Sequence, residues 1–482
     1  MKFKKVYTLL LLAPLLTGCA LPSDDESLSS ENPTEDTSKD TQEEIKSNNL
    51  QDANILHAWN WKMNDIKSRL TTIKEAGYEA IQISPMQPKV DKTNWSNEST
   101  SSQWWKLYQP LEFKVATNGE NFLGTKTELT SLCAVAKQKG ISIIVDVVTN
   151  HLAGNGGGYD GQVYTKYPMH NYNGGANDNN GESVCRGNIG LPDIDTSNKQ
   201  VQNAVLNMMK EYIDCGVSGF RFDAAKHIET PDDGSYASDY WTTVLQGTTV
   251  YAVGKNKPAP YYYGEVLNTP GQGRNWSSYT KLMSICDNKQ GTATVNAVKN
   301  SQASSISKDY NINVNPNHLV LWAESHDTYA NNSGYEITRE FSTDVINRTY
   351  MIQASRKDAA TLYFARPQHM GVTICSIADD SGWKNTEIKA INDFHTHYVG
   401  QSEHISTPDG KYFVNVRGSG AFAGAAIINI NGSSTAKISV NGLQDGNYTD
   451  LVSGNTFAVS NGSVNAKFTN GACILVPKTA NS

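Results

Sequence analysis

The chain has 482 residues and a formal net charge of −7 at pH 7. This acidic balance argues against a nucleic-acid partner, because nucleic-acid-binding proteins carry a basic surface that neutralises phosphates. The length is sufficient for one large domain and a smaller second one.

The N-terminus predicts an exported protein. Lys2, Lys4 and Lys5 precede an apolar run over residues 6–16, which is too short to span a bilayer and is typical of a signal peptide. The run ends in Leu16-Thr17-Gly18-Cys19, which resembles the lipobox of bacterial lipoproteins, whose cysteine becomes the lipid-modified first residue. We expect a lipoprotein signal peptide over residues 1–19 and a cell-surface protein whose only membrane contact is a lipid anchor on Cys19. An ordinary secretory signal with an incidental cysteine would instead give a secreted protein.

Residues 20–52 are rich in Ser, Asp, Glu, Asn and Thr and nearly lack large apolar side chains. A segment of this composition cannot bury a core. It predicts a disordered acidic tether between the anchor and the folded part of the protein.

From residue 53 onward, apolar strands alternate with helices. The first strand, residues 54–59, is followed by a helix over residues 66–76 that ends at Gly77. This alternation indicates a parallel sheet covered on both faces, and the number of units favours an α/β fold of the (β/α)8 type, a TIM barrel, over residues 53–151 and 189–400. The other strands are expected at residues 80–84, 141–148, 219–222, 261–266, 319–323 and 359–364, and the other helices at 129–139, 201–215, 342–355 and 387–399.

Two segments depart from the barrel pattern. Residues 152–188 are rich in Gly and Asn, too long for an ordinary loop and too polar for a core, and they predict a small subdomain inserted after the third strand. Residues 401–482 contain short strands separated by Gly, Asn and Asp turns, at 411–416, 421–430, 437–440 and 473–476. They predict a C-terminal antiparallel β-sandwich.

Polar side chains follow several of the predicted barrel strands, where active sites of such barrels lie. In the stretch GFRFD at 219–223, Arg221 and Asp223 leave the same face of a buried strand, where charges are costly unless they are paired or used. Taken alone, such a pair is usually structural. Other strand ends carry similar residues, however, and the barrel topology would bring them all to one rim: Asp146, His151, Glu265, His326 and Asp327.

Several carboxylates and two histidines at one rim suit glycoside hydrolysis. A retaining glycosidase needs one ionised carboxylate as nucleophile and one protonated carboxyl group as acid. A third carboxylate can raise the pKa of the acid and stabilise a cationic transition state. Imidazole groups can donate hydrogen bonds to sugar hydroxyls as the ring distorts.

These segments resemble the motifs of the α-amylase family, glycoside hydrolase family 13. The motifs are DVVTNH at 146–151, LPDID at 191–195, GFRFDAAKH at 219–227, GEV at 264–266 and ESHD at 324–327. Further stretches, such as ILHAWNW at 55–61 and SHDTYAN at 325–331, are most similar to the Bacillus subtilis type of secreted α-amylase. The resemblance covers about residues 53–475 and implies a TIM barrel that hydrolyses α-1,4-glucosidic bonds.

The resemblance also implies residue roles. Asp223 matches the nucleophile, Glu265 the general acid/base and Asp327 the carboxylate that stabilises the transition state, while Arg221 matches the arginine that keeps the nucleophile ionised. For Asp146 the implied role is mainly structural. The matched substrate contacts are His151 and His326 on the sugar of the cleavage subsite, Tyr108 and Trp105 as its aromatic platform, and Lys226 and His227 on the leaving-group side.

A calcium ion that ties the inserted subdomain to the barrel is implied as well. The family's ligands match Asn150, Asp193 and the main-chain carbonyl group of His227. An all-oxygen ligand set suits Ca²⁺, although an Asn and an Asp that only cap turns would fit the same positions. The inserted segment gives no clear match for further ligands.

Six cysteines follow Cys19 without any metal-ligand spacing. An even number in an exported protein permits disulfides, but their pairing cannot be deduced from sequence. Cys133 and Cys215 lie in predicted helices, where a cysteine can serve as a small buried apolar side chain. The six are Cys133, Cys185, Cys215, Cys286, Cys375 and Cys473.

The sequence therefore predicts a monomeric, calcium-binding α-amylase that cleaves starch, glycogen and related α-glucans internally with retention. One alternative is a transglycosylating or maltooligosaccharide-trimming member of the same family. Another is a non-catalytic, glycan-binding surface lipoprotein. The complete set of Asp223, Glu265 and Asp327 argues against the binding protein, because a binder needs no general acid.

Overall fold

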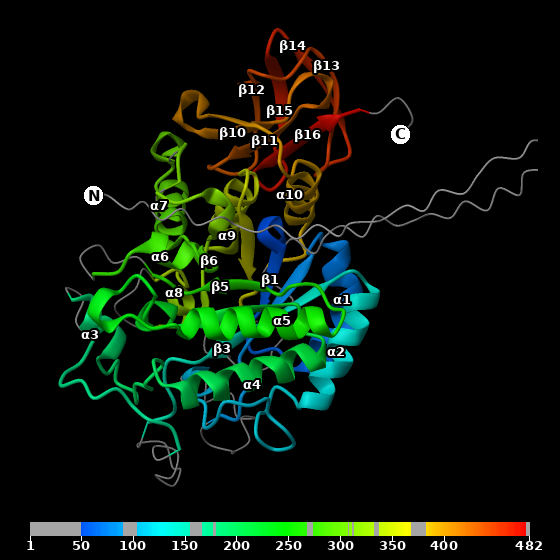
Figure 1. Cartoon of the computed structure of the whole chain (residues 1–482). Helices are drawn as coiled ribbons and strands as arrows, with labels where there is room; N and C mark the ends of the chain where they lie inside the picture. The colour runs from blue at the N-terminus through cyan, green and yellow to red at the C-terminus, as the bar shows by residue number, and fades with distance from the viewer. Residues whose placement is uncertain are drawn as a thin grey trace, which may run out of the picture. The chain divides into compact units, whose positions relative to one another are not determined.

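The computed structural model describes residues 50–89, 104–154, 166–176, 180–267, 273–306, 308–310, 313–331, 337–367 and 382–478. Within these ranges, eight parallel strands close into a barrel in chain order (Figure 1). The first strand closes the ring, since Ile55 lies opposite Ala80 on one side and opposite Leu362 on the other. The predicted (β/α)8 barrel is confirmed. Its strands are β1 (Asn54–Ala58), β2 (Ala80–Ile83), β3 (Ser142–Val148), β4 (Gly219–Asp223), β5 (Tyr261–Gly264), β6 (Ser284–Cys286), β7 (Leu319–Trp322) and β8 (Ala360–Phe364).

Helices cover the outside of the barrel, as α4 and α5 do in Figure 1. The longest, α4, begins after Asn198, whose side chain accepts a hydrogen bond from the Gln200 N–H, and ends at Gly216 with a φ of 98°. Only glycine adopts this left-handed conformation without strain, so the sequence itself ends the helix. The helices are α1 (Met63–Glu75), α2 (Lys126–Gln138), α3 (Gly181–Arg186), α4 (Lys199–Cys215), α5 (Gly247–Gly254), α6 (Trp276–Thr280), α7 (Asn288–Lys299), α8 (His326–Ala330), α9 (Thr343–Ala354) and α10 (Thr386–His397).

The interior of the barrel is filled by apolar side chains that point inward from the strands. Ile55, Ile144 and Val320 belong to one buried cluster, and Leu50 joins it with 5% of its surface exposed. Leu50 lies in a short 3-10 helix, Leu50–Asp52. The predicted disordered tether over residues 20–52 is therefore wrong for its last residues, 50–52. Burial of the apolar Leu50 side chain in this cluster is favourable in free energy, whereas a solvated tether would leave it in water. The rest of the predicted tether and the signal peptide lie outside the described residues.

The C-terminal strands form one antiparallel sheet of eight strands in the order β12-β15-β14-β13-β16-β11-β10-β9. The predicted antiparallel arrangement is confirmed, but hydrogen bonds link the strands into one continuous sheet and not into two separate ones. A single apolar cluster includes Val416 from one end of this order and Ile438 from the other, so the sheet bends around its own core. The strands are β9 (Glu403–Ser406), β10 (Tyr412–Arg417), β11 (Gly424–Asn429), β12 (Thr435–Ser439), β13 (Gly446–Asp450), β14 (Thr456–Ser460), β15 (Ser463–Lys467) and β16 (Ala472–Pro477).

Buried hydrogen bonds join this sheet to the barrel. Arg417 on β10 is 1% exposed, and its Nη1 atom lies 2.9 Å from the carbonyl oxygens of both Ser355 and Arg356, just after α9. Its Nη2 atom donates to the carbonyl group of Tyr398, just after α10. The sheet thus supplies partners for carbonyl groups at the ends of two barrel helices.

The inserted segment is described over residues 166–176 and 180–188. Its helix α3 is capped by Asn180, and a bridge pairs Gly175 with Asn188. A second bridge pairs Met169 with Ile194. In the part of the chain that the structure describes, no helix is long and apolar enough to cross a membrane.

Candidate active site

Arg221 lies at the centre of the predicted rim and contacts three carboxylates. Its Nη1 atom is 2.7 Å from Asp223 Oδ1 and 2.9 Å from both carboxylate oxygens of Asp146, and its Nη2 atom is 3.0 Å from Glu265 Oε2. Asp146 comes from β3, Arg221 and Asp223 come from β4, and Glu265 follows β5. The ends of three neighbouring strands therefore meet on one guanidinium group, which offsets the cost of burying these charges.

The turn after the nucleophile candidate fixes the position of Glu265. Ala224 has a φ of 48°, which is unusual for a residue with a Cβ atom. In this conformation its N–H group lies 2.9 Å from Glu265 Oε2. The N–H group of Lys226 also donates to the main-chain oxygen of Glu265, at 3.2 Å. Backbone strain next to Asp223 is thus coupled to the placement of the second carboxyl group.

Asp327 lies in the first turn of α8, directly after β7. The Nδ2 atom of Asn331 is 3.0 Å from Asp327 Oδ1, and the Nε2 atom of His326 is 3.6 Å from Asp327 Oδ2. Ser325 caps the helix by accepting a hydrogen bond from the Thr328 N–H. The sequence analysis did not identify Asn331, although its i,i+4 spacing from Asp327 on a helix would have indicated the contact.

A buried ion pair supports this helix from below. Arg366, after β8, contacts both carboxylate oxygens of Glu324, at 2.6 and 2.7 Å. Arg366 also donates to the carbonyl oxygens of Thr338 and Phe341, and Thr338 Oγ1 lies 3.0 Å from Thr328 Oγ1 in α8. Because the side chain of Glu324 is fully buried, this bidentate pair connects the ends of β7 and β8 rigidly.

Aromatic rings line one side of the site. The ring of Tyr108 stacks on that of His326, with centroids 5.0 Å apart and planes 9° apart. The sequence analysis did not select Trp104. The centroid of its ring lies 5.7 Å from that of Tyr108 and 5.6 Å from that of His326. The predicted Trp105 is 37% exposed and lies beside Lys106. In a consecutive pair of tryptophans, the sequence does not say which ring faces inward.

The remaining predicted substrate contacts surround the same rim. His151 Nε2 is 2.9 Å from the carbonyl oxygen of Tyr108, and its buried Nδ1 atom has no hydrogen-bond partner among the described residues. The Nδ1 atom of His227 is 2.7 Å from the carbonyl oxygen of Val184 in α3. Lys226 precedes His227 in the turn that contacts Glu265.

The three candidate catalytic carboxyl groups have different protonation tendencies. Burial raises the pKa of Asp223 and raises that of Asp327 well above its usual range, in spite of Arg221. Burial would also raise the pKa of Glu265, but Arg221 and the Ala224 N–H outweigh it and hold this pKa below its usual value. Beneath them, burial raises the pKa of Asp146 to about 7 against the opposing effect of Arg221.

Two histidines of the site, His326 and His227, have lowered pKa values and are neutral at pH 7. Burial lowers the pKa of His326 to about 3, with a further contribution from Arg221. Burial and Lys226 lower the pKa of His227 to about 4. Because each neutral imidazole keeps one donor and one acceptor nitrogen, both side chains can bind neutral hydroxyl groups.

Polar side chains inside the barrel line the bottom of the pocket, and the sequence analysis did not predict them. The pocket that contains Glu265, His326 and Asp327 extends to His57 and Gln82 inside the barrel. Gln82 Nε2 is 3.3 Å from His57 Nε2, and the Tyr263 hydroxyl group donates to Gln82 Oε1. His57 lies in β1, within the stretch ILHAWNW that the sequence analysis noted for its similarity, but it was not selected there as a site residue.

Two of the three predicted calcium ligands, Asn150 and Asp193, lie on adjacent segments. The Ile194 N–H donates to the main-chain oxygen of Asn150 at 3.0 Å, and a bridge pairs His151 with Asp193. Asn150 Oδ1 and Asp193 Oδ1 are both buried and have no hydrogen-bond partner in the described ranges. Two buried, unpaired oxygens of this kind fit a hard cation such as Ca²⁺.

Among the described cysteines, Cys286 lines the pocket that contains Glu265, His326 and Asp327. Cys133, Cys185, Cys215, Cys286 and Cys473 are buried and free, which agrees with the interpretation of Cys133 and Cys215 as small apolar side chains. Cys375 lies outside the described residues. Burial raises the pKa of Cys133 far above that of a free thiol, so it is not a reactive thiolate.

Comparison with known proteins agrees with this geometry. Residues 177–397 match the family model described as the α-amylase catalytic domain. An α-amylase of Clostridium acetobutylicum is 34% identical over 415 residues, which cover 83% of this chain and 50% of that protein. An α-amylase of Butyrivibrio fibrisolvens is 28% identical over 463 residues, covering 87% of this chain and 46% of that protein. The chain thus spans about half the length of these curated relatives.

Solved structures share the fold. A variant of α-amylase I from Eisenia fetida in complex with maltohexaose has a TM-score of 0.68 and 19% sequence identity, covering 88% of this chain and 97% of that chain. An Anoxybacillus α-amylase has a TM-score of 0.66 and 15% identity, covering 89% and 99%. Fold, motifs and the matched catalytic-domain model agree, and the chain belongs to the α-amylase family, glycoside hydrolase family 13.

Proposed function

We propose that the protein is a retaining α-amylase that cleaves internal α-1,4-glucosidic bonds of starch, glycogen and related α-glucans. The observation that carries this proposal is the contact of one guanidinium group, that of Arg221, with Asp223 on one side and Glu265 on the other. It holds two carboxyl groups at one point of the rim, as double displacement requires.

In the proposed reaction, Asp223 attacks the anomeric carbon while Glu265 gives its proton to the leaving glycosidic oxygen. The carbon–oxygen bond to the leaving group breaks as the bond to the Asp223 carboxylate forms. A water molecule then loses a proton to Glu265 and attacks the same carbon, which releases Asp223. Asp327 stabilises the positive charge that develops on the sugar.

The free site is not yet prepared for the first step. Glu265 must carry a proton, but Arg221 and the Ala224 N–H favour its ionised form. We infer that an entering sugar separates Glu265 from Arg221 and excludes water, which raises the pKa of Glu265. Arg221 would then contact only two carboxylates, those of Asp223 and Asp146, and its positive charge would keep the nucleophile ionised.

The α-glucan substrate rests on the curated relatives, which are α-amylases, and on the maltohexaose bound by the E. fetida enzyme. Neutral His326 and His227 suit uncharged sugar hydroxyls. The similarity to the Bacillus subtilis type and the monomeric state stay predictions from the sequence.

Digestion of soluble starch by the full-length protein tests the proposal, with the Asp223→Asn variant as control. A rapid fall in viscosity with a mixture of oligosaccharides would establish internal cleavage. Maltose alone, or longer transfer products, would favour the trimming or transglycosylating alternative. Starch binding without any cleavage would favour the glycan-binding protein.

We propose in addition a structural Ca²⁺ ion held by Asn150, Asp193 and the main-chain oxygen of His227. Its support is the pair of buried, unpaired oxygens on Asn150 and Asp193. When bound, the ion would supply charge compensation between the inserted segment and the barrel. An unchanged melting curve after chelation would count against the site.

The location at the cell surface remains a proposal based on Cys19 and the residues before it. The Cys19→Ser variant should release the protein into the medium if a lipid holds it at the membrane. Retention of the variant in the membrane fraction would exclude this anchor.

A further inference from the structure

The side chain of Arg274, just before α6, is bound to the loop that follows β4. Its Nη1 atom is 2.7 Å from Asp233 Oδ1, and its Nη2 atom is 2.9 Å from Asp233 Oδ2. The two side chains are only 6% and 13% exposed. A bidentate pair of this kind, largely shielded from water, fixes the position of one chain segment relative to the other.

Arg274 also contacts Tyr279 of α6, and both side chains reach the turn that follows the nucleophile. The Nε atom of Arg274 is 3.1 Å from the Tyr279 hydroxyl oxygen, and its Nη2 atom is 3.2 Å from the carbonyl oxygen of Ile228. The hydroxyl group of the fully buried Tyr279 lies 3.0 Å from the carbonyl oxygen of Lys226 and 3.1 Å from that of Ile228. Because Arg274 donates to the hydroxyl oxygen, the hydroxyl hydrogen is directed at these carbonyl groups.

The other side of the same turn holds Glu265. The Ala224 N–H donates to Glu265 Oε2 at 2.9 Å, and the Lys226 N–H donates to the main-chain oxygen of Glu265 at 3.2 Å. The main chain of Lys226 is therefore bound at both ends, to Glu265 through its N–H group and to Tyr279 through its carbonyl group. A displacement of this turn would move the donors that place the Glu265 carboxyl group.

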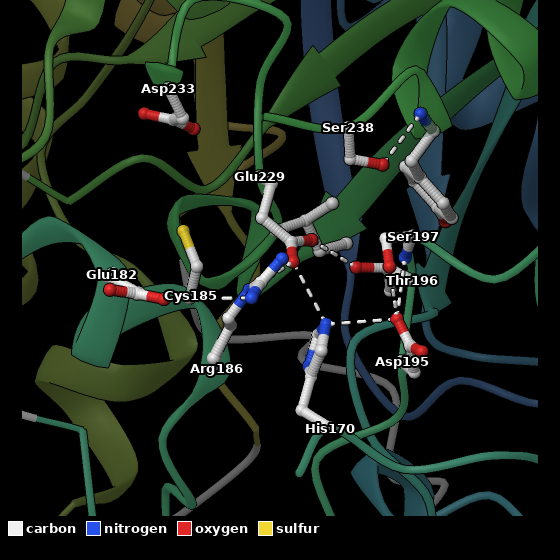
Figure 2. Close-up of polar contacts among 12 residues, drawn as sticks. His170, Glu182, Cys185, Arg186, Asp195, Thr196, Ser197, Glu229, Asp233 and Ser238 are labelled. Carbon is white, nitrogen blue, oxygen red and sulfur yellow. Dashed lines mark hydrogen bonds and ion pairs between the residues drawn. The ribbon is translucent and has the colours of Figure 1, made fainter. Parts of the chain in front are cut away.

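The loop after β4 has a second anchor, which does not involve Arg274. Glu229 Oε1 lies 2.9 Å from His170 Nε2 and 3.2 Å from Arg186 Nε, and both of these residues belong to the inserted segment. Figure 2 shows His170 and Arg186 converging on Glu229, while Asp233 lies apart from them. One carboxylate of the loop thus binds the inserted segment, and the other binds Arg274. The two anchors can be removed separately.

We propose that Arg274 is a positioning residue for the general acid, because it fixes, through Tyr279, the turn that holds Glu265. This inference rests on the function proposed above for Glu265. Proton transfer to the leaving oxygen requires the carboxyl group within about 2.6–3.2 Å of that oxygen, so a small displacement of the turn impairs this step. The nucleophile Asp223 lies on β4 and is held by Arg221. Loss of Arg274 therefore affects protonation of the leaving group more than nucleophilic attack.

Two substrates with different leaving groups separate this role from a merely structural one. Maltopentaose releases a sugar, whose oxygen must be protonated as the bond breaks, whereas α-maltotriosyl fluoride releases fluoride, a stable anion that needs no proton. The quantity to compare is kcat/KM of the full-length protein, because it reports the steps up to departure of the leaving group. Hydrolysis of the glycosyl-enzyme intermediate, in which Glu265 acts as a base, then does not enter the comparison.

The Arg274→Met variant should lower kcat/KM for maltopentaose about ten- to a hundredfold and leave the value for α-maltotriosyl fluoride nearly unchanged. Equal losses for the two substrates, or no loss for either, would overturn the proposal, because misfolding or loosening lowers both alike. Arg186→Met is the matched control, since it removes the cation from the other carboxylate of the same loop. Any loss in this control should be equal for the two substrates. A selective loss there would also overturn the assignment, because any loosening of the loop would then suffice.

A second variant decides the matter if Arg274→Met does not fold. Tyr279→Phe removes only the hydroxyl group between Arg274 and the turn, and it should give the same selective loss on maltopentaose with a smaller magnitude. Equal effects of Tyr279→Phe on the two substrates would overturn the proposal. If the wild type cleaves neither substrate, the proposed function itself fails. If the wild type cleaves both and the variants show no selectivity, only the role of Arg274 fails.

Discussion

The Nη2 atom of Arg221 lies 3.0 Å from Oε2 of Glu265, the carboxyl group that must donate a proton in the proposed reaction. This contact lowers the pKa of Glu265 in the free protein. Glycoside hydrolysis needs the opposite, a protonated acid at working pH. The arrangement therefore couples substrate entry to protonation, because the sugar must separate the two groups before the acid can act.

The first prediction concerns pH profiles. The profile of kcat/KM reports groups of the free enzyme and that of kcat reports groups of the complex. Loss of the Glu265 proton ends activity as pH rises, so the basic limb of kcat should lie at higher pH than that of kcat/KM. The acid limb should lie above the ordinary aspartate pKa, since burial raises the pKa of Asp223 and this nucleophile must be ionised. Superimposed basic limbs would refute the rearrangement of Arg221.

The Asp223→Asn variant should lose activity on starch by several orders of magnitude, because an amide cannot form the glycosyl-enzyme bond. Its melting temperature should stay near that of the wild type, since Asn can still accept a hydrogen bond from Arg221. The exposed Asp445 provides the matched control, and Asp445→Asn should keep full activity. A Asp223→Asn variant with near-normal turnover would remove Asp223 as nucleophile.

Asn331 should act as a positioning residue for Asp327. Its Nδ2 atom donates to Asp327 Oδ1 at 3.0 Å and so favours the ionised carboxylate. Asn331→Ala should reduce kcat about ten- to a hundredfold, the usual value of a hydrogen bond to a charged group, with little change in KM. The acid limb of the pH profile should move to higher pH, because the pKa of Asp327 would rise further. The exposed Asn317 gives a control, Asn317→Ala, and a uniform loss of stability without a shifted limb would contradict this role.

The Arg366–Glu324 pair should be important for stability. Arg366→Leu leaves the fully buried Glu324 carboxylate without its partner, which should lower the free energy of unfolding by about 3–5 kcal/mol. The double variant Arg366→Leu/Glu324→Gln should recover part of this loss. Lys281→Leu breaks the exposed ion pair with Asp232 and should change the free energy of unfolding far less, because water screens exposed charges. Denaturant unfolding measures all three, and equal losses for Arg366→Leu and Lys281→Leu would exclude the proposed role.

Residues on regular strands were predicted well from the sequence. The apolar run before Asp146 and the Gly-bounded stretch before Asp223 each gave a strand, and the parallel barrel then placed their ends together. The three residues of β6, Ser284–Cys286, were missed because so short a run has no periodicity. In the C-terminal sheet, strands β9, β13, β14 and β15 were also missed. Within each of them, buried residues are interspersed with exposed or partly exposed ones, so the strand has no continuous apolar run.

Contacts that depend on three-dimensional packing could not be predicted. Trp104 and Trp105 are consecutive tryptophans, and the sequence does not show which of them lines the site. The packing of Trp104 against Tyr108 and His326 shows that Trp104 does. His170 lies in a Gly- and Asn-rich segment without any periodic pattern, and its three carboxylate partners are 23, 25 and 59 positions away in the chain. The role of a side chain is predictable where the backbone pattern sets its direction, and not where long-range packing does.

The hydrogen bonds of Arg417 bear on how the chain folds during synthesis and on where it can be truncated. The carbonyl groups of Ser355 and Arg356, between α9 and β8, find partners only when β10 is in place. On the ribosome, the carbonyl groups that follow α9 therefore gain their Arg417 partner only after the chain has been synthesised beyond Arg417. A gene fragment that ends after α10 would encode every catalytic residue named above but would lack these buried hydrogen bonds between the sheet and the barrel.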